Sequence, residues 1–185
     1  MKKIITSIVL LTFLLGGCTS NESVTEPTQI SSQQQIPELP DADVVFEKSR
    51  IFSQEIDGTV GGNIQFSMNY KSKGHTISIS GTLEIPAGAF GATRDISLIL
   101  NSKKAMIDLY PSPMSFDIPL KLDLCYQGLD LRRLTIDQID FYYLNEFTNT
   151  YELMNSAGKV FDASTGLLGI TGVEIPHFSR YIWVR

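Results

Sequence analysis

The sequence predicts an all-β protein with an antiparallel β-sandwich, and three features indicate this fold. From about Val44 onward apolar residues alternate with polar ones, which is the pattern of strands with one buried face. Turn-forming pairs such as Asp57-Gly58 and Gln127-Gly128 separate the alternating runs at short intervals. No long run with helical spacing interrupts them. We therefore expect residues 44–185 to form two packed antiparallel sheets.

Four alternating runs carry this prediction, each with an apolar residue at nearly every second position. They cover residues 64–70, 77–85, 96–100 and 116–126. The last run is the most regular and includes Ile118 among its apolar positions. Pro119 interrupts it, which favours an edge strand or a bulge, because proline cannot donate to the hydrogen-bond ladder. Residues 129–138 are the one segment in which we expect a helical turn.

The N-terminus has the three parts of a secretory signal peptide. Lys2 and Lys3 precede an apolar stretch over residues 4–15, and small residues follow it. The stretch is too short for a helix that spans a bilayer, which needs about 20 apolar residues. The run Leu-Gly-Gly-Cys that ends at Cys18 resembles the lipobox of bacterial lipoproteins. The resemblance implies that residues 1–17 are removed and that Cys18 is lipidated. An ordinary signal peptide with a coincidental cysteine is the alternative.

The lipobox implies a location and a partner. In bacterial lipoproteins the cysteine thiol carries a diacylglycerol and the new amine usually carries a further acyl chain such as palmitate. Two or three acyl chains anchor a protein stably, because each buried methylene contributes about 0.8 kcal/mol. We therefore expect a lipoprotein of the cell envelope, anchored in the membrane on its extracytoplasmic side. In the enteric lipoprotein pattern an aspartate directly after the cysteine retains the protein on the inner membrane. Thr19 occupies this position here, so the resemblance implies outer-membrane localisation where the organism has such a membrane.

Residues 18–43 predict a flexible linker that begins with the lipidated cysteine. Ser, Thr, Gln, Glu and Pro dominate it, and such a segment buries too little apolar surface to offset the entropy of ordering. A flexible chain of some 25 residues has a mean reach on the order of 25–30 Å. This reach would lift the folded domain off the membrane.

Charge and side-chain inventory exclude several functions. Removal of residues 1–17 takes away Lys2 and Lys3, which leaves 13 basic against 20 acidic residues. This balance argues against nucleic acid as a partner, since its binding needs a basic face. Cys125 is the only cysteine besides Cys18, and its place in an alternating strand favours a buried, unreactive thiol. With two histidines in the chain we expect no metal site, no cofactor and no enzyme activity.

Three sequence segments together resemble a known domain family. They are Gly-Thr-Leu-Glu-Ile-Pro-Ala-Gly-Ala-Phe at 81–90, Phe-Asp-Ile-Pro-Leu-Lys-Leu-Asp-Leu at 116–124 and Glu-Ile-Pro-His-Phe-Ser-Arg-Tyr at 174–181. A hairpin expected over residues 142–153 precedes the third segment. In this order they resemble the ZU-five domain, the β-sandwich of zonula occludens proteins, netrin receptors and ankyrins. The resemblance covers about residues 55–185 and implies a non-catalytic binding or spacer module.

The His-Phe-Ser segment has a sharper interpretation. In related self-cleaving domains the chain is cut between Phe and Ser, which here implies attack of Ser179 Oγ on the carbonyl carbon of Phe178. Those relatives use an additional upstream histidine as the base, whereas His75 lies far earlier and the hairpin offers Glu146 and Glu152 instead. A carboxylate with an ordinary pKa of about 4.3 is a poor base for a hydroxyl. We therefore expect an uncut chain, with His177 in a structural role.

Aromatic residues on the predicted hairpin suggest a second alternative, a glycan- or peptide-binding sandwich. The candidates are Tyr142, Tyr143, Phe147 and Tyr151. The simpler interpretation is cross-strand packing, in which alternate members such as Phe141 and Tyr143 share one face of the sheet. The sequence thus predicts an exported interaction or structural module whose partners are the membrane, through the N-terminal lipid, and envelope proteins or glycans.

Overall fold

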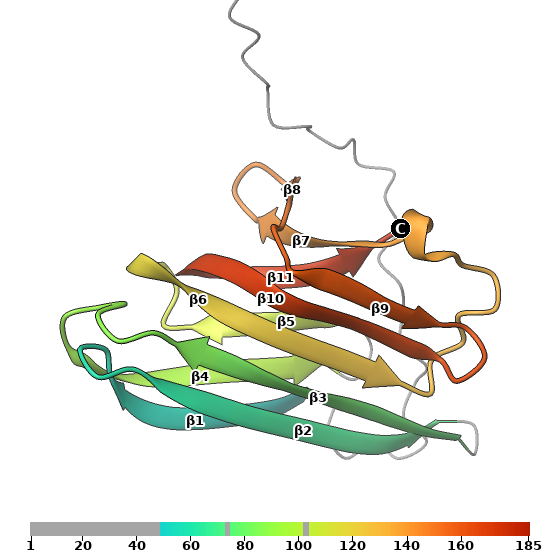
Figure 1. Cartoon of the computed structure of the whole chain (residues 1–185), viewed down its shortest axis with the longest axis horizontal. Coiled ribbons are helices and arrows are strands. Elements are labelled where there is room, and N and C mark those ends of the chain that lie inside the picture. Colours follow the sequence, from blue (N-terminus) through green and yellow to red (C-terminus); the bar gives the residue numbers. More distant parts are fainter. Residues whose placement is uncertain (1–48, 73–74, 102–103) are drawn as a thin grey trace, which may run out of the picture.

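The computed structural model describes residues 49–72, 75–101 and 104–185, and these form two antiparallel sheets packed face to face (Figure 1). The predicted all-β sandwich is confirmed. The predicted signal peptide over residues 1–17 and the predicted linker over residues 18–43, with the expected lipidation site Cys18, lie outside the described residues. The first described strand begins at Ser49, five residues after the sequence-predicted start of the domain at Val44.

Eleven strands and one short helical turn make up the described chain. They are β1 (Ser49–Asp57), β2 (Gly62–Ser72), β3 (His75–Ile85), β4 (Thr93–Asn101), β5 (Met106–Tyr110), β6 (Met114–Gln127), the 3-10 turn η1 (Ile136–Gln138), β7 (Asp140–Asn145), β8 (Thr150–Leu153), β9 (Gly158–Asp162), β10 (Leu167–Phe178) and β11 (Arg180–Val184). The turn η1 lies inside the segment where the sequence predicted one.

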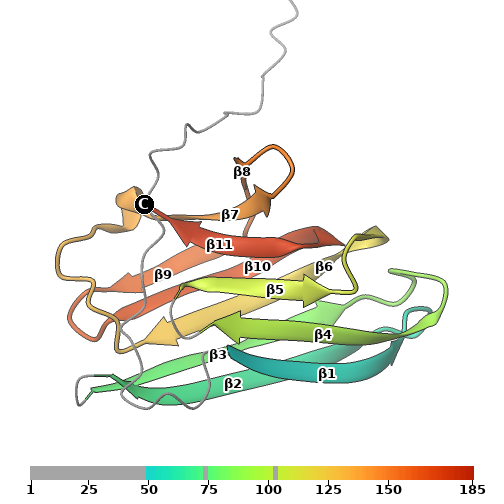
Figure 2. The same cartoon turned by 180° about the vertical axis from the view of Figure 1, so that it is seen from behind.

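The chain alternates between the two sheets, usually two strands at a time. One sheet has six strands in the order β1-β4-β5-β11-β7-β8, and the other has five in the order β2-β3-β6-β10-β9 (Figures 1 and 2). Every pairing is antiparallel. The last crossing joins β10 of the five-stranded sheet to β11 of the six-stranded sheet, and Ser179 is the residue between them.

The core between the sheets contains the apolar positions that the alternation predicted. Residues of β2, β3, β4 and β6 such as Phe66, Ile79, Leu98 and Leu122 are at most 4% exposed. Gly81 occupies an inward position of β3 and lies opposite Phe66 in the register. The Phe66 ring fills this space, because a Cβ added at Gly81 would come within 2.5 Å of its Cζ.

The sequence prediction is wrong at Ile118, which is 44% exposed rather than buried. The cause is an irregular register between β6 and β10. Ile175 pairs with Leu120, but His177, two residues later, pairs with Ser115, five residues away on β6. Pro119 lies in this irregular segment, so the bulge predicted for it is present. The alternative of an edge strand is wrong, because β6 lies between β3 and β10.

A second apolar cluster lies on the other face of the six-stranded sheet. It consists of Met106, Tyr142, Ile182 and Val184. Ile182 and Val184 alternate with Tyr181 and Trp183 along β11, yet all four side chains are at most 1% exposed. The C-terminal strand is therefore apolar on both faces, which fits its position between β5 and β7 (Figure 2).

Candidate functional site

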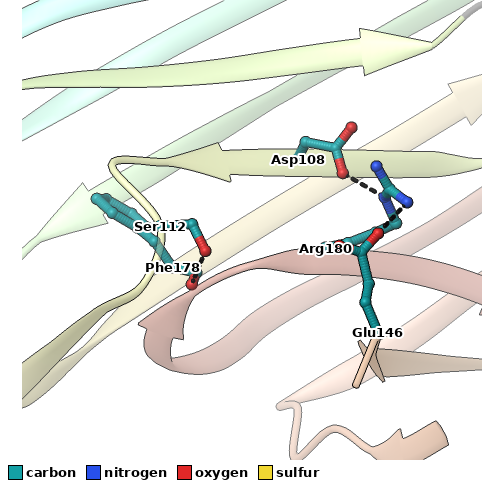
Figure 3. Close-up of polar contacts among 5 residues, drawn as sticks. All are labelled: Asp108, Ser112, Glu146, Phe178 and Arg180. Atoms are coloured by element: carbon teal, nitrogen blue, oxygen red, sulfur yellow. Dashed lines mark hydrogen bonds and ion pairs between the residues drawn. The ribbon is translucent and has the colours of Figure 1, made fainter. Parts of the chain in front are cut away.

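The His-Phe-Ser segment lies where the chain passes from one sheet to the other. The carbonyl oxygen of Phe178 accepts a hydrogen bond from the Ser112 hydroxyl at 3.0 Å (Figure 3). The carbonyl oxygen of Ser179 accepts another from the backbone N–H of Leu109 at 2.9 Å. Both peptide groups are thus held to the β5–β6 region, which fixes the position of the crossover.

The next residue, Arg180, ties the same crossover to two acidic side chains. Its Nε donates to Asp108 at 2.6 Å, and its Nη1 donates to Glu146 (Figure 3). Glu146 was one of two carboxylates considered as a base for Ser179, and it is instead paired with a guanidinium.

Self-cleavage needs a base beside Ser179 Oγ, and none of the described residues forms a hydrogen bond with this hydroxyl. His75 begins β3 and lies near the β9–β10 turn, where β10 starts, whereas Ser179 follows the other end of β10. The Ser112 hydroxyl is one donor at the Phe178 carbonyl oxygen, as an oxyanion site would need. In the structure this hydrogen bond holds the carbonyl group of Phe178 in place.

His177 has contacts that fit the expected structural role. Its ring meets the Tyr143 ring edge to face, with centroids 4.6 Å apart. Its carbonyl oxygen accepts a hydrogen bond of 2.5 Å from the Tyr181 hydroxyl. Burial raises the pKa of Tyr181, so this hydroxyl keeps its proton and remains a donor. These contacts connect β10, β7 and β11.

The Tyr143–His177 pair forms one wall of an open groove, which we name the His177 groove. The groove encloses about 310 Å³, and the residues that line it include Pro119, Tyr143, Glu152, Leu153, Glu174 and His177. They come from β6, β7, β8 and β10, and so from both sheets. The predicted hairpin and the His-Phe-Ser segment, both candidate regions in the sequence, therefore meet here.

The groove exists because the strands on this side of the sandwich are short. β9 pairs with β10 only from Leu167 to Thr171, so the rest of β10 has no neighbouring strand on that side. The segment between β8 and β9 crosses over this gap, where the carbonyl oxygen of Asn155 accepts a hydrogen bond from the Glu174 N–H at 3.1 Å. Pro176, which has no N–H, follows on the same strand and also lines the groove.

The four aromatic binding candidates do not form one surface. Tyr143 lines the groove, while Tyr142 and Tyr151 meet on the opposite face of the six-stranded sheet, with ring centroids 6.2 Å apart. Phe147 is fully exposed in the turn between β7 and β8. The simpler interpretation is confirmed for Phe141 and Tyr143, which share the inner face and both approach the Tyr181 ring.

A larger hollow of about 640 Å³ lies at the other end of the five-stranded sheet, beside His75 and Thr165. Its charged groups already have partners. Arg132 donates twice to Asp130, and these hydrogen bonds hold the pKa of Asp130 at about 2. This hollow is therefore lined by groups that neutralise one another, unlike the His177 groove.

Other chemical candidates are limited within the described ranges. Cys125 is half-buried, and this burial raises the pKa of its thiol, which favours the protonated thiol over the nucleophilic thiolate. No cluster of three or more His, Cys, Asp or Glu that could hold a metal is found among these residues. The same residues contain no helix that could cross a bilayer.

Sequence reasoning missed Glu174 and considered Glu152 only as a base. In the structure both carboxylates line the groove, one on β10 and one on β8. The alternation of Glu174 with Val173 and Ile175 marks it as outward-facing, but its proximity to a strand of the other sheet depends on the sheet packing.

Comparisons of the chain with family models, curated proteins and solved structures gave no match.

Proposed function

We propose that this protein is an exported lipoprotein, anchored in the membrane by Cys18, whose β-sandwich is a non-catalytic interaction module that binds through the His177 groove. The observation that carries the binding part is the composition of the groove. Aromatic, apolar and acidic side chains from both sheets surround one open space. Such a mixture of apolar wall and few polar groups is typical of binding sites.

The surroundings of Ser179 favour binding over self-cleavage. A Ser nucleophile needs an adjacent base, and Glu146, one of the two carboxylates considered for this role, is paired with Arg180. The Phe178 and Ser179 carbonyl groups are both hydrogen-bonded to neighbouring segments. These contacts support a crossover that positions the groove rather than a bond that breaks.

The anchor is proposed from the sequence, and its test uses the two cysteines of the chain. Wild-type protein is expected to partition into the detergent phase when a Triton extract is separated into detergent and aqueous phases. Cys18→Ser is expected either to keep its signal peptide or to appear in the aqueous phase without lipid. Cys125→Ser is the matched control and should partition like the wild type. Equal partitioning of wild type and Cys18→Ser would contradict the lipoprotein proposal.

Intact mass of the same wild-type preparation tests the rest of the proposal. The expected mass is that of residues 18–185 plus the acyl chains. A mass deficit that matches loss of residues 179–185 would instead support self-cleavage, and Ser179→Ala should then abolish it.

A further inference from the structure

The charged side chains in the described part of the chain differ in whether they form ion pairs. Asp108 and Glu146 pair with Arg180, Asp140 pairs with Lys159, and Asp130 pairs with Arg132. Within the described residues, neither Glu152 nor Glu174 forms an ion pair. These two carboxylates line the same groove although they belong to different sheets.

One neighbouring cation partly offsets this charge. Lys121 lies in register with Glu174 on one side and with Glu84 on the other. A single lysine therefore faces two carboxylates across the sheet, while Glu152 on β8 has Tyr143 as its cross-strand neighbour. The groove keeps an excess of negative charge.

The rest of the lining fits the remainder of a long basic side chain. Pro119, Leu153 and Met154 supply apolar wall, against which a methylene stem can pack. Tyr143 and His177 supply aromatic rings, and the face of a tyrosine attracts a cation. The carboxylates of Glu152 and Glu174 in the same lining provide hydrogen-bond acceptors for an ammonium or guanidinium group.

We propose that the His177 groove binds a lysine or arginine side chain of a partner polypeptide. This inference rests on the proposed function and adds the chemistry of the ligand to it. Charge complementarity selects a basic ligand, and the apolar and aromatic wall selects a side chain with a long stem over a small cation.

The exposed edge of β10 indicates recognition of a side chain rather than addition of a strand. A partner strand would need successive backbone donors and acceptors along this edge. The Glu174 N–H is already bonded to Asn155, and Pro176 has no N–H to offer. The backbone of β10 therefore cannot extend the five-stranded sheet at the groove, and specificity falls to side chains.

The experiment measures binding of a basic peptide to the full lipoprotein in nonionic detergent. The probe is a fluorescein-labelled peptide of alternating Gly and Lys residues, followed by fluorescence anisotropy. The Glu152→Gln/Glu174→Gln double variant is expected to weaken binding by about three- to tenfold, because exposed ion pairs contribute modestly. The same peptide with acetylated lysines is expected not to bind.

The matched control is the Glu55→Gln/Asp137→Asn double variant, which changes the net charge equally at exposed positions outside the groove. It should bind within about twofold of the wild type. Equal weakening by both double variants would overturn the proposal, since it would indicate general charge attraction. Failure of the wild type to bind the Lys peptide would overturn it as well.

A parallel titration with a labelled chitooligosaccharide separates this inference from the proposed function. Binding of the sugar without binding of the peptide would overturn this inference but leave the proposed interaction module in place, with another class of ligand. Loss of membrane partitioning or a chain cut after Phe178 would contradict the proposed function itself, whatever the peptide does.

Discussion

The two lateral sides of the sandwich are closed by strands of very different length. On one side β1 and β2 have 9 and 11 residues, and each pairs along its whole length with β4 or β3. On the other side β8 and β9 have only 4 and 5 residues (Figure 1). Long edge strands cover their neighbours completely. Short ones leave part of β10 uncovered, and the groove lies there.

The aromatic residues follow the same division. On the side with long edges, Phe52 and Phe66 pack near Gly81, with ring centroids 6.0 Å apart. On the side with short edges, Trp183 contacts Phe141, and further ring contacts lead through Tyr181 and Tyr143 to His177. A continuous series of rings therefore connects the buried core to the groove wall, so core packing on this side also supports the candidate site.

The largest expected effect tests the core beside the short edges. Trp183 is fully buried and its ring centroid lies 5.3 Å from that of Phe141. Trp183→Ala is expected to lower the free energy of unfolding by about 3–5 kcal/mol, measured by urea denaturation. Phe147→Ala, at the fully exposed hairpin turn, is the control and should stay within about 0.5 kcal/mol of the wild type. Similar losses for both variants would contradict this account of the packing.

The second prediction tests the side with long edges. A Cβ at Gly81 would overlap the carbonyl oxygen of Asp123 and the Phe66 ring, so β3 and β6 would have to separate. Gly81→Ala should therefore lower the free energy of unfolding by about 1–3 kcal/mol. Gly91→Ala is the matched control, since an added Cβ there meets no atom within 4 Å, and its effect should be within about 0.5 kcal/mol. An unchanged free energy of unfolding for Gly81→Ala would mean that β3 and β6 can accommodate the added Cβ without loss of packing.

The third prediction concerns the two serines at the crossover. Ser112→Ala removes the donor to the Phe178 carbonyl oxygen and should lower the free energy of unfolding by about 0.5–1.5 kcal/mol. Ser179→Ala should cost less than about 0.5 kcal/mol, because its hydroxyl has no hydrogen bond within the described residues. Denaturing electrophoresis should show the same full mature length for wild type and both variants. A larger loss for Ser179→Ala than for Ser112→Ala would reverse this assignment.

The smallest expected effect lies in β6, between the two sides. Tyr126 is fully buried, and its hydroxyl has no hydrogen-bond partner in the described part of the chain. Tyr126→Phe should raise the free energy of unfolding by up to about 1 kcal/mol at neutral pH, because an unsatisfied polar group leaves the core. A loss of more than about 1 kcal/mol would indicate a hydrogen bond to this hydroxyl.

The same variant should respond differently to alkaline pH. Burial, with a further contribution from the neighbouring Tyr70, raises the pKa of Tyr126 above its ordinary value. A raised pKa in the folded state means that the contribution to stability is complete below about pH 10, where the unfolded phenol is still protonated, and declines at higher pH. The wild type should therefore lose stability above pH 10 more steeply than Tyr126→Phe in urea titrations.

Alternation predicted the inward positions of most strands well, because each sheet of the sandwich packs one face against the other sheet. It failed at Ile118, where the irregular register beside Pro119 turns the side chain outward. It also missed the burial of Ile182, which packs with Tyr142 on the far face of the six-stranded sheet. In both places the outcome depends on the neighbouring strands, which single-strand periodicity does not contain.

The candidate site was predictable only in parts. The hairpin and the His-Phe-Ser segment were recognised separately, and their meeting at Tyr143 and His177 follows from the crossover at Ser179. That Glu152 and Glu174 line the same groove depends on how the two sheets pack against each other. The spacing of these two residues in the sequence does not predict that they lie in one site.

The placement of the groove opposite β1 has a mechanical consequence. Under the proposed function, a ligand pulls at β8 and β10 while the anchor holds the chain where it enters β1 at Ser49. The load then crosses the sheets from edge to edge, and strands separate one hydrogen bond at a time instead of sliding past one another. Separating hydrogen bonds one at a time needs less force than breaking them together. A domain loaded in this direction would therefore unfold at low force and release its ligand under tension.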